Sequence, residues 1–206
     1  MDPSALKRIT IRSEDFFLEG LLCLQEGKKG AVLTHPHPLY GGDMHNVVVT
    51  SLAQAFETCG FTTLRFNFRG VGKSQGIYSH GKGESQDVLF AIEHLQELGK
   101  EELYLAGYSF GAWVNTLAIA PDDAIAQVMV APPVAAIDFE NKGPFPGLSL
   151  VVAGQFDEFA PPRMIKQYLP RWNPEAHLVV IDGADHFFFN HAQKIESAVS
   201  QHLAGT

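Results

Sequence analysis

Cysteine is nearly absent from this sequence, with Cys23 and Cys59 the only two among 206 residues. They stand in the apolar segments LLCLQ and AFETCGF, and their spacing matches no metal-binding or redox motif. The sequence therefore indicates neither a disulfide-rich secreted domain nor a cysteine-based zinc site. We expect two buried, reduced thiols in a protein of a reducing compartment, by default the cytoplasm.

Positive charge and long hydrophobic runs are also lacking. The chain has 15 lysine and arginine residues against 23 aspartate and glutamate residues, for a net charge of −8. Nucleic-acid binding needs a basic surface, so we expect no nucleic-acid partner. No apolar run approaches the roughly 20 residues of a membrane span, and the opening MDPSALKRIT has no apolar signal-peptide core. We expect no membrane partner.

Hydrophobic residues make up 46% of the chain and charged residues 18%, as in globular proteins. We find no internal repeat, low-complexity tract or linker, so residues 1–206 are expected to form a single domain. Apolar runs predict strands near 8–13, 16–24, 30–34, 61–67, 102–107, 126–131, 148–153 and 177–182. Helical periodicity or helix-start signals predict helices over 44–59 and 84–98, from Ser109 to before Pro121, from Pro161 onward, and over 189–203.

The order of these elements predicts an α/β fold. Two opening strands, expected to form an antiparallel edge, precede an alternation of strands and helices. The runs over 30–33 and 148–153 are almost continuously apolar, which is typical of parallel strands buried on both faces. We therefore expect a mostly parallel sheet of about eight strands with helices on both faces.

The segment GYSFG, residues 107–111, directly follows the strand-like run over 103–106 and opens a predicted helix. Strand, turn and helix form the setting of a nucleophile elbow, in which a strained serine presents its hydroxyl above the sheet. Gly107 and Gly111 would let the strand and the helix pack closely. The alternative is that Ser109 is a plain helix N-cap.

An activated serine needs a base and a carboxylate that orients it, expected in the chain order serine, acid, histidine. Asp157 follows the strand over 148–153, and His186 follows the last strand. Both lie at the carboxyl ends of strands, where α/β sheets bind ligands. Glu158 is an alternative to Asp157, and Asp185 ranks lower because sequence neighbours seldom point at each other.

These segments resemble the α/β-hydrolase family over nearly the whole chain. GYSFG, GQFDEFAP and GADHFF resemble its nucleophile, acid and histidine segments, and LRFNFRGVGKSQG (64–76) resembles one of its strand-loop segments. LTHPHPLYGGDMHN (33–46) stands where many members have an oxyanion loop. The closest likeness is to small, lidless bacterial serine hydrolases with an HPHP segment. The resemblance implies an α/β-hydrolase fold with Ser109, Asp157 and His186 as catalytic residues.

An oxyanion hole needs two N–H donors. The first is expected from Phe110, which follows the nucleophile. Pro36 and Pro38 have no N–H, which leaves His37, Leu39 and Tyr40 for the second. We favour Tyr40, then Leu39.

Other polar and aromatic residues near these loops have two interpretations. His35 and His37 have the spacing of a metal pair but no third ligand, so structural hydrogen bonds to the loop backbone are favoured over metal. For Arg69, Tyr78 and His80, a place in the pocket lining and a place on the solvated surface are equal alternatives. Core or pocket wall is expected for Trp113 and for Phe187, Phe188 and Phe189.

The predicted reaction is the cleavage of carboxylic esters with small or exposed acyl groups through an acyl-enzyme, with no metal or other cofactor. About 15 residues separate the sixth and seventh predicted strands, which is too few for a helical lid. The pocket is then expected to be open to solvent, or covered by short loops or by a partner subunit. The last alternative allows a homodimer. A thioesterase, an acyl-peptide hydrolase and a non-catalytic binding module on the same scaffold remain alternatives.

Overall fold

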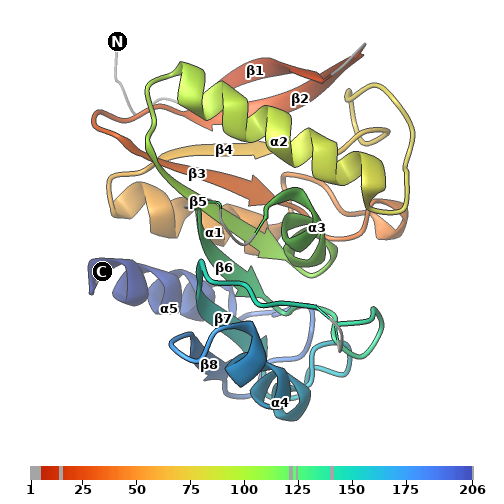
Figure 1. Cartoon of the computed structure of the whole chain (residues 1–206), viewed down its shortest axis with the longest axis vertical. Helices are drawn as coiled ribbons and strands as arrows, with labels where there is room; N and C mark the ends of the chain where they lie inside the picture. The colour runs from red at the N-terminus through yellow and green to blue at the C-terminus, as the bar shows by residue number, and fades with distance from the viewer. Residues whose placement is uncertain (1–5, 14–15, 121–122, 124, 140–141, 206) are drawn as a thin grey trace.

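In the part of the chain that the structure describes, eight strands form one mixed sheet in the order β1-β2-β4-β3-β5-β6-β7-β8 (Figure 1). The computed structural model describes residues 6–13, 16–120, 123, 125–139 and 142–205. The strands are β1 (Leu6–Ser13), β2 (Phe16–Cys23), β3 (Lys29–Thr34), β4 (Thr62–Phe66), β5 (Glu102–Tyr108), β6 (Ala126–Val130), β7 (Leu148–Gly154) and β8 (His177–Ile181). All eight predicted strands are confirmed, with ends shifted by one or two residues.

The pairing also follows the prediction. β1 pairs antiparallel with β2, and β2 antiparallel with β4, at one edge of the sheet. From β4 through β3, β5, β6 and β7 to β8 every pair is parallel. The carboxyl ends of the parallel strands therefore meet at one edge of the sheet, where the loops after β3, β5, β7 and β8 lie close together.

Among the described residues, five α-helices cover both faces of the sheet (Figure 1). They are α1 (Val47–Thr58), α2 (Lys82–Glu97), α3 (Phe110–Ala118), α4 (Pro162–Trp172) and α5 (Ala192–Ala204). Helices α1 and α5 pack side by side on one face, and α2 and α3 lie together on the other. The predicted α/β fold with helices on both faces is confirmed.

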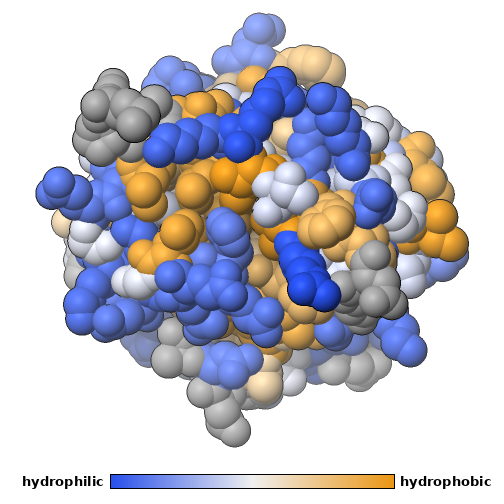
Figure 2. All heavy atoms as spheres, turned by 90° about the horizontal axis from the view of Figure 1, so that it is seen from above, coloured by the Kyte–Doolittle hydropathy of each residue, from blue (hydrophilic) through white to orange (hydrophobic). Residues whose placement is uncertain are grey.

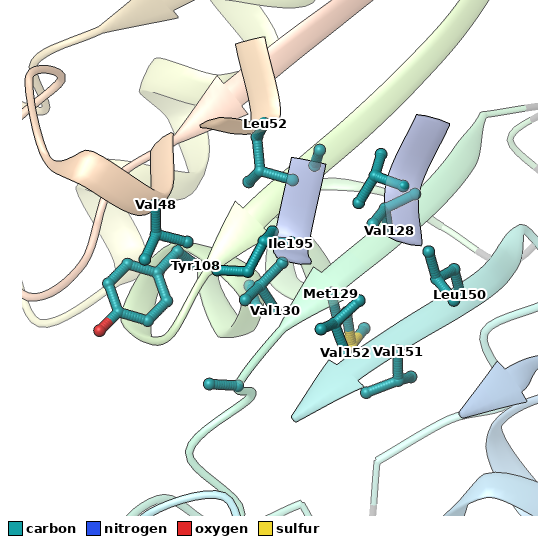
Figure 3. Close-up of a cluster of buried hydrophobic side chains, with 14 of the residues drawn as sticks. Val48, Leu52, Tyr108, Val128, Met129, Val130, Leu150, Val151, Val152 and Ile195 are labelled. Carbon is teal, nitrogen blue, oxygen red and sulfur yellow. The ribbon is translucent and has the colours of Figure 1, made fainter. Parts of the chain in front are cut away.

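Two hydrophobic clusters fill the space between the sheet and its helices. In the larger one, Val48 and Leu52 of α1 and Ile195 of α5 meet side chains of β6 and β7 (Figure 3). Tyr108, the last residue of β5, belongs to the same cluster and immediately precedes Ser109. The strand end that carries the serine is thus held by the core.

The starts of α1 and α5 differ from the prediction by three residues each. α1 begins at Val47 because the side chain of Asn46 accepts the N–H of Val48 at 2.9 Å. α5 begins at Ala192 rather than at residue 189, because Asn190 has a left-handed backbone conformation, with φ of 61°, that does not fit a right-handed helix. Pro121, the expected limit of α3, lies outside the described residues, and α3 already ends at Ala118.

The cysteine prediction is confirmed only in part. Cys23 is buried in β2, whereas Cys59, at the C-cap of α1, is partly exposed. Neither is joined in a disulfide.

No helix or strand stands between β6 and β7 in residues 131–139 and 142–147, the described part of that connection. The predicted absence of a lid at this place is confirmed.

Viewed from the end with β1, β2 and α2, the surface alternates hydrophilic side chains with smaller hydrophobic patches (Figure 2). Within the described ranges, every helix is too short or too polar to cross a membrane.

Candidate active site

Ser109 occupies a strained turn between β5 and α3. Its backbone has φ of 54° and ψ of −117°, a conformation that a residue with a side chain rarely adopts. A Cβ at Gly107 would lie 2.5 Å from the backbone nitrogen of Ala112, so the close return of the helix over the strand requires glycine there. This is the geometry predicted for an elbow.

Gly111 was expected to allow close packing between β5 and α3, but its close neighbours are at the end of β3. A Cβ there would lie 2.6 Å from the carbonyl oxygen of Thr34 and 2.7 Å from that of His35. Gly111 therefore lets the start of α3 touch the end of β3. This contact brings the 35–42 loop next to Ser109.

The three residues of the predicted triad lie in one hydrogen-bonded row. Ser109 Oγ is 3.0 Å from Nε2 of His186. Nδ1 of the same imidazole is 2.9 Å from each carboxylate oxygen of Asp157. All three residues are more than nine-tenths buried, which strengthens their electrostatic interactions.

Asp157 is fixed by its own loop. Its Oδ1 accepts the N–H of Phe159 at 2.9 Å and that of Ala160 at 2.7 Å. Both donors are backbone groups of the loop after β7, so the loop itself orients the carboxylate. These two backbone hydrogen bonds therefore hold the carboxylate in position to face His186.

His186 is held by the turn that carries it and by β5. The carboxylate of Asp185 accepts the N–H groups of Phe187 and Phe188 at 3.0 and 3.1 Å. The hydroxyl of Tyr108 donates to the carbonyl oxygen of His186 at 2.9 Å. Burial and the charge of Asp157 raise the pKa of Tyr108, so this donor keeps its proton.

The alternatives to Asp157 are placed differently. Glu158 is an exposed residue of the same loop, and the carboxylate of Asp185 caps its own turn. Tyr108 was missed by the sequence analysis, although its position just before the elbow serine, at a strand end, was visible.

The oxyanion donors favoured from sequence are engaged inside their own loop. The N–H of Leu39 donates to Nδ1 of His37 at 3.2 Å, and that of Tyr40 donates to the carbonyl oxygen of His37 at 3.1 Å. Together they form a 3-10 turn over Pro38–Tyr40, capped by His37. Among the described residues, the N–H of His37 has no acceptor, and Phe110, as the first residue of α3, has no intrahelical one. Contrary to the expectation from sequence, the N–H groups of Tyr40 and Leu39 are therefore already used and are not available as the second oxyanion donor.

His35 and His37 both make hydrogen bonds within the loops, as favoured from sequence. His35 Nε2 accepts the N–H of Phe68 at 3.0 Å, and Nδ1 lies 2.7 Å from the carbonyl oxygen of Pro36. Burial lowers the pKa of His35 to about 4. In the described parts of the chain no group of three potential ligands forms around either histidine.

A cavity of about 980 Å³ opens above Ser109 and His186. Its remaining walls come from the loops after β3, β4, β6, β7 and β8, with Trp113 of α3. No aspartate, glutamate, lysine or arginine among the described residues lines it, and aromatic and imidazole rings dominate. The site is therefore suited to an uncharged part of a substrate.

Tyr78, His80, Trp113 and Phe187 line this cavity, whereas Arg69 does not. Arg69 is buried against Asp87, with 2.7 Å between Nη2 and Oδ1. Asp87 lies in the second turn of α2, which begins at Lys82. Phe188 is buried in the core, and Phe189 is exposed.

Comparison with known proteins places this geometry in a family. No family model matches the chain. An α/β serine hydrolase homologue from Coxiella burnetii is 34% identical, with a TM-score of 0.85 over 96% of this chain and 97% of that one. A lidless α/β serine hydrolase from Xanthomonas campestris is 31% identical, with a TM-score of 0.88 over 100% of this chain and 96% of the other.

The fold is that of an α/β-hydrolase scaffold, and the buried Ser109–His186–Asp157 row lies at the carboxyl ends of its strands. The chain belongs to the α/β serine hydrolases and resembles their lidless members. It is also 34% identical over 184 residues to protein RP471 of Rickettsia prowazekii, covering 84% of this chain and 77% of that protein.

Proposed function

We propose that this protein hydrolyses carboxylic esters with uncharged acyl groups through a Ser109–His186–Asp157 triad. The observation that carries the proposal is the 3.0 Å separation of Ser109 Oγ and His186 Nε2 in a cavity whose described walls carry no charged residue. A serine hydroxyl becomes a nucleophile when a base at this distance takes its proton. Membership of the α/β serine hydrolases supports the same reaction class.

In the first half-reaction, Ser109 Oγ attacks the ester carbonyl carbon while His186 Nε2 takes the hydroxyl proton. Asp157 holds Nδ1 of the imidazole and stabilises the imidazolium that forms. The C–O bond to the alcohol then breaks, and the alcohol leaves with the proton from Nε2. In the second half-reaction water repeats these steps on the acyl-enzyme and releases the acid.

The oxyanion formed in each half-reaction receives the N–H groups of Phe110 and His37. Both lack another acceptor among the described residues, and both residues line the cavity beside Ser109. Each such donor typically contributes about 3 kcal/mol to transition-state stabilisation. The contact of Gly111 with the Thr34 and His35 carbonyls supports this pairing, because it brings the two segments together.

The test is the hydrolysis of 4-nitrophenyl butanoate by the wild type and by Ser109→Ala. We expect kcat to fall by at least about 10³-fold in the variant, since removal of a triad nucleophile has larger effects in related chemistry. Ser149→Ala, on β7, serves as the matched control and is expected to retain the wild-type rate. A Ser109→Ala variant with unreduced hydrolysis would exclude Ser109 as the nucleophile.

A further inference from the structure

His37 makes two hydrogen bonds through its ring, one from each nitrogen. Nδ1 accepts the backbone N–H of Leu39 at 3.2 Å. Nε2 lies 3.1 Å from the hydroxyl oxygen of Tyr78. The two rings are 5.2 Å apart between centroids, so the contact is also a packed one.

The first of these bonds determines where the imidazole proton is. A backbone N–H can only donate, so Nδ1 must carry a lone pair and no proton. Burial lowers the pKa of His37, which favours the neutral ring. In a neutral ring with unprotonated Nδ1, the proton is on Nε2, and Nε2 therefore donates to the oxygen of Tyr78.

The hydroxyl proton of Tyr78 is then left without an acceptor. His37 Nε2 uses the oxygen as an acceptor, and the hydroxyl has no other partner among the described residues. Tyr78 is only partly exposed and lines the cavity above Ser109. The cavity thus contains a side-chain O–H whose partner has to come from a bound molecule or from water.

The position of Tyr78 in the cavity tells which part of an ester it meets. The rings of Phe159, Phe187 and Tyr108 lie 4.9, 5.6 and 5.7 Å from that of His186 and form one wall. The rings of Phe110 and Tyr78 lie 4.7 and 5.2 Å from that of His37 and form the other. Because His186 gives its proton to the leaving alcohol, the alcohol lies beside His186, and the rings around His37 line the part of the cavity that this leaves for the acyl group.

We propose that Tyr78 is a specificity-determining residue whose hydroxyl, oriented by His37, donates a hydrogen bond to an oxygen within the acyl group of the substrate. This inference rests on the proposed ester hydrolysis at Ser109. It defines the substrate class as uncharged esters that carry an ether, hydroxyl or carbonyl oxygen in the acyl chain beyond the scissile carbonyl. An acyl chain without this oxygen leaves the Tyr78 proton unpaired in an apolar cavity, which is unfavourable.

The kinetic test compares 4-nitrophenyl esters in isosteric pairs. Each pair has either an oxygen or a methylene at the same place, as in methoxyacetyl and butanoyl, with the oxygen moved stepwise along longer chains. The ratio of kcat/KM for the two members is measured in the wild type, in Tyr78→Phe and in Tyr168→Phe. Because each variant sees the same two esters, their intrinsic reactivities cancel.

For the best oxygen position, we expect Tyr78→Phe to lower the oxygen-to-methylene ratio by about 3- to 10-fold, whereas a change below about 2-fold at every position would overturn the proposal. Tyr168→Phe, on α4, is expected to leave the ratio unchanged. A wild type that hydrolyses none of the esters would instead contradict the proposed function. The two failures are therefore distinguishable.

A second test reads the orientation of the hydrogen bond directly. Long-range ¹H–¹⁵N NMR spectra distinguish the two neutral histidine tautomers, and His37→Gln identifies the His37 signals. We expect the tautomer protonated at Nε2. Protonation at Nδ1 would overturn the proposal, because the Tyr78 proton would then be donated to Nε2.

Discussion

Asp157 and His186 are joined by two equal contacts, with both carboxylate oxygens 2.9 Å from Nδ1 of the imidazole. The same carboxylate accepts two backbone N–H groups of its own loop, from Phe159 and Ala160. The acid is thus oriented by the fold before any substrate arrives. An arrangement of this kind fixes the tautomer of the histidine and the direction of its free nitrogen.

Replacing Asp157 by asparagine is expected to lower kcat by about 10⁴-fold, because an amide N–H facing Nδ1 favours the wrong tautomer. Steady-state hydrolysis of 4-nitrophenyl butanoate measures the effect. The matched control is Glu158→Gln, which changes an exposed carboxylate next to it in sequence and is expected to be silent. Equal losses in both variants would contradict the assignment.

Gly42 supports the loop that carries the N–H of His37. A Cβ at Gly42 would overlap the carbonyl oxygen of Pro36, which is backbone and must move to make room. We expect Gly42→Ala to displace the His37 N–H and lower kcat by about 10²-fold or more, the usual effect of losing one oxyanion donor.

The neighbouring glycine provides the comparison for this prediction. Gly41 has φ of 80°, but a Cβ there would meet no described atom within 4 Å, so Gly41→Ala adds backbone strain without a clash. It is expected to lower stability more than it lowers kcat. If Gly41→Ala costs as much activity as Gly42→Ala, the loop does not act through the position of His37.

His35 makes the stability depend on pH. Its Nε2 accepts a backbone N–H, so the buried ring must be neutral, and burial lowers its pKa to about 4 from 6.5. Between these values the unfolded chain binds a proton that the folded protein does not, so stability is full above pH 6.5 and decreases as the pH falls. The expected loss by pH 4 is about 3 kcal/mol.

Urea unfolding at pH 7, 5.5 and 4.5 checks this prediction in the wild type and in His35→Gln. The variant is expected to be less stable at pH 7 but to have a flatter pH dependence, because it no longer has the buried titrating ring. Parallel pH profiles for the two proteins would show that another group is responsible.

Arg69, in the loop after β4, and Asp87, on α2, form a buried ion pair. The carboxylate has no exposed surface and accepts hydrogen bonds from the Arg69 side chain, from its backbone N–H and from Ser13. Burial raises the pKa of Asp87, and the bonds from Arg69 oppose the rise. Arg69→Met alone is expected to cost about 3–5 kcal/mol, because it leaves a buried charge unpaired.

The double variant Arg69→Met/Asp87→Leu tests the origin of that cost. It is expected to recover much of the lost stability in urea unfolding, since no unpaired charge is left in the core. Lys28→Met, which breaks an ion pair with both side chains largely exposed, serves as control and is expected to have no measurable effect. Additive losses in the double variant would contradict the account.

The sequence predicted the strands, the elbow and the order of the site residues because these depend on local patterns. GYSFG lies after an apolar run, and Asp157 and His186 each follow a strand, so the sheet alone brings them to one edge. His37, the proposed second oxyanion donor, was a candidate from the sequence but ranked behind Tyr40 and Leu39, for a physical reason. The turn over Pro38–Tyr40 consumes the N–H groups of Leu39 and Tyr40, and only the hydrogen-bond pattern shows it.

Other relationships depend on contacts between distant segments. Arg69 was expected at the pocket or the surface, but it pairs with Asp87, and Ser13 joins the pair from β1. Tyr78 was named as a possible pocket residue, yet its bond to His37 crosses from one loop to another. No periodicity or motif in either segment carries this information.

The central claim is that the fold activates the hydroxyl of Ser109, and a single mass measurement tests it most directly. The intact protein is incubated with a fluorophosphonate under native conditions, beside Ser109→Ala and the Ser149→Ala control. We predict one covalent adduct on the wild type and on the control, and none on Ser109→Ala. An unmodified wild type, or an adduct that persists in Ser109→Ala, would contradict the account.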